Sequence, residues 1–95
     1  MVRIVKMKFQ KEKISDFKAL FEDRKEKIES QEGCHSVALL LDLSDPTKMF
    51  TYSIWDNENC LNAYRHSDFF KATWIQTKAM FDGKPEAWSL ETLAE

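Results

Sequence analysis

Two kinds of hydrophobic spacing alternate along the chain and divide it into strands and helices. Segments rich in β-branched and aromatic residues, with apolar side chains on both faces, predict four strands: 2–9, 34–43, 48–55 and 86–93. Apolar side chains three or four positions apart predict two long helices, 15–31 and 67–81, and a shorter one at 57–64. The predicted order is therefore β-α-β-β-α-β, with the short helix placed directly before the second long one.

Residues at the expected element ends support this division. Asp56 and Ser67 are suited to cap the short helix and the helix that follows it. Gly33 is expected to end the first helix, and the Asp82-Gly83 pair the last one. The stretch 44–47 (SDPT) is typical of a turn, so the strands on either side of it should form a hairpin.

This order of elements is that of the ferredoxin-like α+β fold, a four-stranded antiparallel sheet with helices on one face. The uncovered face of such a sheet is expected to be polar in a monomer. Every predicted strand here carries apolar side chains on both faces, so the second face should be buried against another sheet. A symmetric homodimer provides that sheet without a second kind of chain, and we expect one.

Composition and charge narrow the functional classes. The chain of 95 residues is predicted to form one domain, residues 1–95, and its net charge of −2 gives no reason to expect binding to nucleic acid or to an anionic membrane. Cys34 and Cys60 fit neither a disulfide framework nor a zinc site. No apolar run is long enough to span a membrane, and we expect a cytoplasmic protein. Seven Phe, three Trp and two Tyr predict a tight core, a dimer interface or a pocket for a flat ligand.

The stretch from strand three into the last helix resembles the antibiotic biosynthesis monooxygenase (ABM) family, whose members are dimeric α+β barrels. The family pattern has a Gly-Cys entry to strand two, an Asp-Pro hairpin, a Trp closing strand three, an Ala in the short helix, and Ser and Phe opening the next helix. The matching residues here are Gly33, Cys34, Asp45, Pro46, Trp55, Ala63, Ser67 and Phe70. The resemblance covers essentially the whole chain.

The resemblance implies a monooxygenase that needs neither a metal nor a flavin. Family members of this kind bind an electron-rich phenol, let it ionise, and allow the resulting carbanion to reduce O2. The chain departs from the family where two histidines are usual, because Tyr64 and Phe69 stand there. Relatives that degrade haem use an Asn, a Trp and a His. The corresponding places here hold Met7 or Phe9, Tyr64 and Trp74, which argues against haem breakdown.

Such a reaction requires an apolar slot, which four rings are expected to line between sheet and helices: Trp55, Trp74, Phe70 and Phe17. The alternative is that these rings only fill the core.

The reaction also requires groups that favour an ionised ligand. Tyr52 and Tyr64 are candidates to hydrogen-bond a ligand oxygen, His35 and His66 to act as bases, and Arg24 to act as a fixed cation. The structural alternatives are tyrosines bonded to backbone carbonyls, solvated histidines, and an arginine that reaches the edge of its helix.

Two other functions remain open at this point. A dimeric binding module would use the same cleft for a hydrophobic small molecule without catalysis. An isomerase or decarboxylase of a related α+β barrel would use the same tyrosines and histidines without O2.

Overall fold

The computed structural model describes residues 1–95 and contains four strands, three α-helices and one short 3-10 helix. In chain order they are β1 Val2–Lys8, η1 Lys11–Lys13, α1 Ile14–Glu29, β2 Cys34–Leu41, β3 Lys48–Trp55, α2 Glu58–Arg65, α3 Asp68–Lys78 and β4 Glu86–Leu90.

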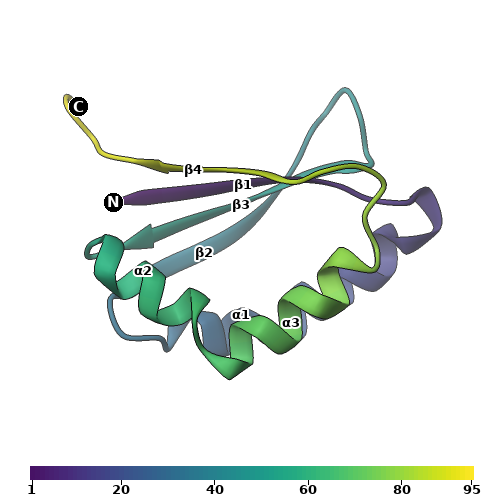
Figure 1. Ribbon diagram of the computed structural model, residues 1–95. Helices are drawn as coiled ribbons and strands as arrows, with labels where there is room; N and C mark the ends of the chain where they lie inside the picture. The colour runs from purple at the N-terminus through teal and green to yellow at the C-terminus, as the bar shows by residue number, and fades with distance from the viewer.

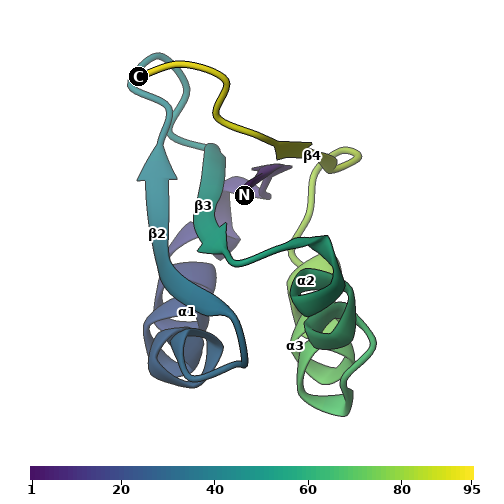
Figure 2. The same ribbon diagram turned by 90° about the vertical axis from the view of Figure 1, so that its left-hand side faces the viewer.

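The strands form one antiparallel sheet in the order β2-β3-β1-β4. All helices lie on the same side of this sheet, with α1 beneath β2 and with α2 and α3 together on the other flank (Figures 1 and 2). The predicted ferredoxin-like α+β fold with a four-stranded antiparallel sheet is therefore confirmed. The β-α-β-β-α-β order places the first and third strands in the centre, which is the arrangement that the split βαβ topology requires.

The inner face of the sheet, which faces the helices, carries the core. Strand residues alternate between faces, so Met7, Met49 and Val37 come to the inner face on three neighbouring strands. Helix α1 packs against them through Phe17, Phe21 and other side chains at helical spacing. The resulting buried cluster consists of Met7, Phe9, Phe17, Phe21, Ile28, Val37 and Met49.

The outer face of the sheet carries apolar side chains on all four strands and is covered by no element of the chain (Figure 2). Register places Ile4 between Tyr52 on β3 and Trp88 on β4 on this face. Leu40 and Trp88 leave 47% and 41% of their surface exposed. The prediction that both faces of the sheet are apolar is confirmed.

Two helix ends differ from the sequence prediction. Asn57, not Asp56, caps α2, and its Oδ1 accepts a hydrogen bond of 2.9 Å from the backbone N–H of Cys60. The carboxylate of Asp56 instead contacts the ring of His35. The helix α1 ends at Glu29, before Gly33 is reached. Gly33 has a φ of 80° in the turn into β2, where a Cβ atom would lie 2.5 Å from the Sγ of Cys60. Gly33 is therefore required for the close approach of this turn to α2.

The cap of α3 and the hairpin turn follow the prediction. The Ser67 hydroxyl accepts a hydrogen bond of 3.1 Å from the backbone N–H of Phe70. In the turn, Asp45 accepts hydrogen bonds from the hydroxyl and the backbone N–H of Thr47, which lower the pKa of its carboxyl group.

Several elements are shorter than predicted. Strand β2 ends at Leu41 rather than residue 43, β4 ends at Leu90 rather than 93, and α3 ends at Lys78 rather than 81. Phe9 lies just beyond β1 and makes an isolated bridge with Phe81, so both residues leave their predicted elements to pair with each other. No helix of the chain has the length and apolar character needed to cross a membrane.

Candidate functional site

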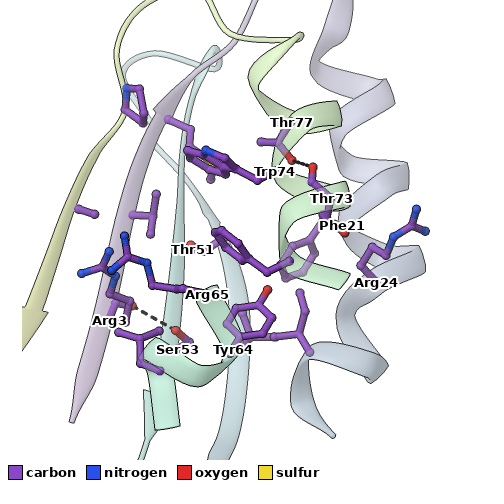
Figure 3. A pocket seen from close by; sticks show the side chains of 18 of the residues that line it. Arg3, Phe21, Arg24, Thr51, Ser53, Tyr64, Arg65, Thr73, Trp74 and Thr77 are labelled. Carbon is purple, nitrogen blue, oxygen red and sulfur yellow. Dashed lines mark hydrogen bonds between the residues drawn. The ribbon is translucent and has the colours of Figure 1, made fainter. Parts of the chain in front are cut away.

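A cavity of about 250 Å³ lies between the inner face of the sheet and the helices (Figure 3). Its walls come from all four strands on one side and from α1, α2 and α3 on the other. Five residues at helical spacing on α1 line it, as do four on α3: Phe17, Leu20, Phe21, Arg24 and Ile28, and Phe70, Thr73, Trp74 and Thr77. The four rings expected to form an apolar slot, Trp55, Trp74, Phe70 and Phe17, are all lining residues.

A continuous series of aromatic contacts runs along the cavity. Trp55 stacks on Tyr64 with ring centres 5.2 Å apart, and Tyr64 meets the edge of Phe70 at 5.1 Å. Phe70 then stacks on Trp74 at 5.8 Å, and Trp74 meets Phe81. The indole N–H of Trp55 donates to the hydroxyl of Ser53 at 2.9 Å, so this buried ring is fixed in orientation. The series presents flat apolar surfaces of the kind that stack on planar aromatic ligands.

Tyr64 is the predicted catalytic residue that the structure places in this cavity with its hydroxyl unpaired. It projects from α2 between Trp55 and Phe70, and its hydroxyl makes no hydrogen bond with the chain. Burial, assisted by the neighbouring Cys34, raises the pKa of Tyr64 to about 12. At neutral pH this phenol is therefore protonated and acts as a hydrogen-bond donor rather than as a base.

Thr73 contributes a second polar group without a partner. Its hydroxyl oxygen is buried and makes no hydrogen bond, whereas Thr77, one turn later on α3, donates to the backbone carbonyl of Thr73 at 2.9 Å (Figure 3). A buried hydroxyl without a partner costs free energy, on the order of 1–3 kcal/mol.

Two arginines converge at one side of the cavity, Arg3 from β1 and Arg65 from α2 (Figure 3). Arg3 donates to the hydroxyl of Ser89 at 2.9 Å. Burial lowers the pKa of Arg3, and repulsion from Arg65 lowers it further. Neither guanidinium group forms an ion pair with a carboxylate of the chain.

Arg24, the predicted fixed cation, has a different environment. It lies at the α1 edge of the cavity, and its guanidinium group points away from the interior toward its ion-pair partner Asp23 (Figure 3). This arrangement corresponds to the alternative in which the side chain reaches the edge of its helix.

The structure does not bring Tyr52, His35 or His66 to the cavity. Tyr52 lies on the outer face of the sheet, with 37% of its surface exposed. His35 lies at a β-bulge between Cys34 and Ser36, which removes it from the alternation that would have put it beside Val37. Its Nε2 contacts Asp56 Oδ1 at 2.5 Å.

His66 is the residue at the end of α2. Its Nδ1 lies 2.7 Å from the backbone carbonyl oxygen of Asn62, one turn earlier. Its side chain is exposed and hydrogen-bonds to a backbone carbonyl at the end of α2, so it does not reach the cavity.

The polar groups that sequence reasoning missed are Arg3, Arg65 and Thr73. Arg3 shares its strand face with Val5 and Met7, so a cation alternating with core residues was an available signal. Arg65 and Thr73 carry no comparable signal, because exposed cations and small hydroxyls are common on helices. No group of three or more His, Cys, Asp and Glu side chains is arranged to hold a metal ion.

Comparison with protein families gives one match. The model of a family described as antibiotic biosynthesis monooxygenase (ABM) matches residues 1–74. The matched range includes β1, α1, the β2–β3 hairpin, α2 and most of α3, and therefore nearly all of the residues that line the cavity. No curated protein matches the chain.

Solved structures with the same fold include a conserved protein from Methanosarcina mazei Go1, which is 25% identical with a TM-score of 0.84 over 90% of this chain and 86% of that chain. A crystal structure of an antibiotic biosynthesis monooxygenase has a TM-score of 0.88 at 16% identity, covering 99% of this chain and 100% of that chain. Rv0793 from Mycobacterium tuberculosis has the same score and identity, covering 99% and 95%. At such low identity the last two likenesses concern the fold alone.

Proposed function

The chain belongs to the antibiotic biosynthesis monooxygenase family, and on that premise we propose that its cavity binds a phenol- or quinol-like aromatic molecule and oxidises it with O2 without a cofactor. The observation that carries this proposal is the unpaired hydroxyl of Tyr64 within a cavity of stacked aromatic rings. The rings provide flat contact surface for a planar ligand, and the hydroxyl provides a donor for its oxygen atom.

Tyr64 acts in this proposal by favouring the ionised form of the ligand. Because its pKa is raised to about 12, it stays protonated while a bound phenol or enol loses its proton. A hydrogen bond from Tyr64 to the resulting oxyanion stabilises the negative charge, and a low-polarity cavity strengthens that bond. The nearby positive charges of Arg3 and Arg65 lower the pKa of the ligand in the same direction.

The proposed reaction needs no external reductant. The ionised ligand transfers an electron to O2, the resulting radical pair combines into a hydroperoxide at carbon, and the hydroperoxide loses water to leave a carbonyl group. A ring methylene of the ligand supplies all of the electrons. One oxygen atom enters the product, and the other leaves as water.

The test is O2 consumption with anthrone as substrate. Wild-type protein should consume O2 and form anthraquinone, and Tyr64→Phe should lower kcat about a hundredfold by removing the donor. Tyr52→Phe is the matched control, since it removes the same hydroxyl from the opposite face of the sheet and should leave kcat within about twofold of wild type. The free energy of unfolding of Tyr64→Phe should stay within about 1 kcal/mol of wild type.

Other outcomes would support the alternative functions. Binding of anthrone without O2 consumption would favour a binding module. Turnover of a related substrate under anaerobic conditions would favour an isomerase or decarboxylase. Equal loss in the two tyrosine variants would contradict the role given to Tyr64.

We also propose that two copies of the chain pair through the outer face of the sheet. The support is the exposed apolar surface over all four strands, to which Leu40, Tyr52, Trp88 and Leu90 contribute. Exposed apolar patches of this kind mark interfaces between proteins. Sedimentation at micromolar concentration should give twice the chain mass, and a stable monomer would contradict the proposal. The cytoplasmic location expected from the sequence stays a prediction.

A further inference from the structure

We propose that the cavity selects aromatic ligands that carry a carboxylate group, which Arg3 and Arg65 bind together while the ring lies against Trp74 and Phe70. This inference rests on the proposed function, because it assigns a substrate class to the same cavity. It adds an anion-binding side to a site whose other walls are apolar.

Positive charge is in local excess at this side of the cavity. Arg3 and Arg65 both line the cavity, and their guanidinium groups converge on the side nearest β1 (Figure 3). The one carboxylate residue among the lining residues is Glu86, and its side chain forms an ion pair with Lys6 at 3.5 Å. Glu58 acts on Arg3 only at longer range. Two close cations that form no ion pair with a carboxylate make a site to which an anion binds favourably.

The guanidinium group of Arg3 is already held in position before a ligand binds. It belongs to the inner face of β1, and the hydroxyl of Ser89 on the neighbouring strand β4 fixes its Nη1 at 2.9 Å. A guanidinium group held in this way loses less conformational freedom when it binds a carboxylate, and its planar donors match the two oxygen atoms. Arg24 differs, since Asp23 already neutralises it.

The position of Tyr64 also supports the assignment. Its hydroxyl has no hydrogen-bond partner in the chain, and in Figure 3 it lies farther toward α1 and α3 than the two arginines do. A ligand held by Arg3 and Arg65 therefore extends its ring past Phe70 toward this hydroxyl. The volume of about 250 Å³ lies just below the range of about 300–1,000 Å³ that is usual for drug-sized ligands, so a compact ring system is expected.

The experiment compares the binding of naphthoate and naphthamide by calorimetry. The two probes have the same rings, and only naphthoate is charged. Wild-type protein should bind naphthoate about tenfold or more tightly than naphthamide, because hydrogen bonds to charged groups are the stronger kind. Raising the salt concentration should weaken the binding of naphthoate only.

The variant Arg65→Gln should lower the affinity for naphthoate about tenfold and leave naphthamide within about twofold of wild type. Arg65 is exposed at the end of α2, so this variant is expected to fold. Arg3→Gln tests the other cation in the same way. Lys71→Gln is the matched control: it removes one positive charge from an exposed position next to Phe70 but does not line the cavity, and both affinities should be unchanged.

Equal affinity of wild type for both probes would overturn the anion-binding side and leave the proposed aromatic site intact. Equal losses of naphthoate binding in Arg65→Gln and Lys71→Gln would also overturn it, because the effect would then be one of net charge. Failure to bind either probe would overturn this inference, and the anthrone assay then decides separately whether the proposed function stands. The oxygen assay with anthrone, which carries no carboxylate, is independent of this result.

Discussion

The two faces of the sheet are built from the same strands and have opposite surroundings. On the inner face Met7, Met49 and Trp55 each leave only 2% of their surface exposed. On the outer face Tyr52 and Leu90 leave 37% and 45% of their surface exposed, although they too are large hydrophobic residues. The inner face owes its burial to helices of the same chain, whereas the outer face has no covering element (Figure 1). Hydrophobic pattern therefore identifies surfaces that need a partner, and topology decides whether the chain itself supplies one.

The largest expected effect is on the inner face. Phe9 is fully buried and stacks on Phe17 with ring centres 4.3 Å apart. Phe9→Ala should lower the free energy of unfolding by about 3–5 kcal/mol, through lost burial and the cavity that remains. Leu40→Ala on the outer face is the control and should cost less than about 1 kcal/mol at protein concentrations where that face is free. Urea denaturation measures both, and equal costs would contradict the contrast between the faces.

A second test concerns the pH dependence of stability on the inner side. The pKa of Tyr64 is raised to about 12 in the folded chain, against about 10 when unfolded. Below pH 10 the phenol is protonated in both states, so its contribution is fully present there. Between pH 10 and 12 the unfolded chain loses this proton and the folded chain keeps it, so stability falls as pH rises, by on the order of 1–3 kcal/mol. The free energy of unfolding, measured at several pH values, should fall more between pH 10 and 12 in wild type than in Tyr64→Phe.

A third test concerns the outer face. If two sheets pack through it, Tyr52→Glu places an unpaired carboxylate in their interface. The dimer should then weaken by about 2 kcal/mol, or roughly thirtyfold in its dissociation constant. Sedimentation would detect the shift, and circular dichroism should show an unchanged fold. An unaltered dimer in this variant would place the contact elsewhere on the molecule.

The smallest effect is expected in the helices that cover the inner face. Ser67→Ala removes the hydroxyl that accepts from the backbone N–H of Phe70. The loss of such a cap should cost about 1 kcal/mol, and it acts on the helix that carries Phe70 and Trp74. Thermal or urea denaturation measures it. Ser67→Asp should retain most of the stability, because aspartate also caps helices.

Alternation and helical spacing were sufficient to predict the fold. The order of elements, the stripe on α1 and the apolar outer face all follow from periodic positions that the backbone geometry repeats. The element ends were less predictable, since Asn57 and Asp56 are adjacent and equally suited to capping. Only the contact of Asp56 with His35 separates them.

The candidate site was predictable in part. The four aromatic rings and Tyr64 reached the cavity because they lie on faces that must point inward. His35 did not, because a single bulge in β2 shifts it out of the alternation between the faces. No residue near it in the sequence predicts that bulge. Arg65 was missed because its role depends on Arg3, which is distant in sequence and meets it only in the folded chain.

The placement of the three tryptophans has a practical consequence. Trp55 is buried in the core, Trp74 lines the cavity, and Trp88 lies on the outer face. Indole emission depends on the polarity around the ring, so Trp55 and Trp74 report on unfolding and on ligand entry into the cavity that both rings line, whereas Trp88 reports on pairing of the sheets. Variants that keep one tryptophan and replace the other two by phenylalanine would allow these events to be followed separately, by intrinsic fluorescence and without an attached dye.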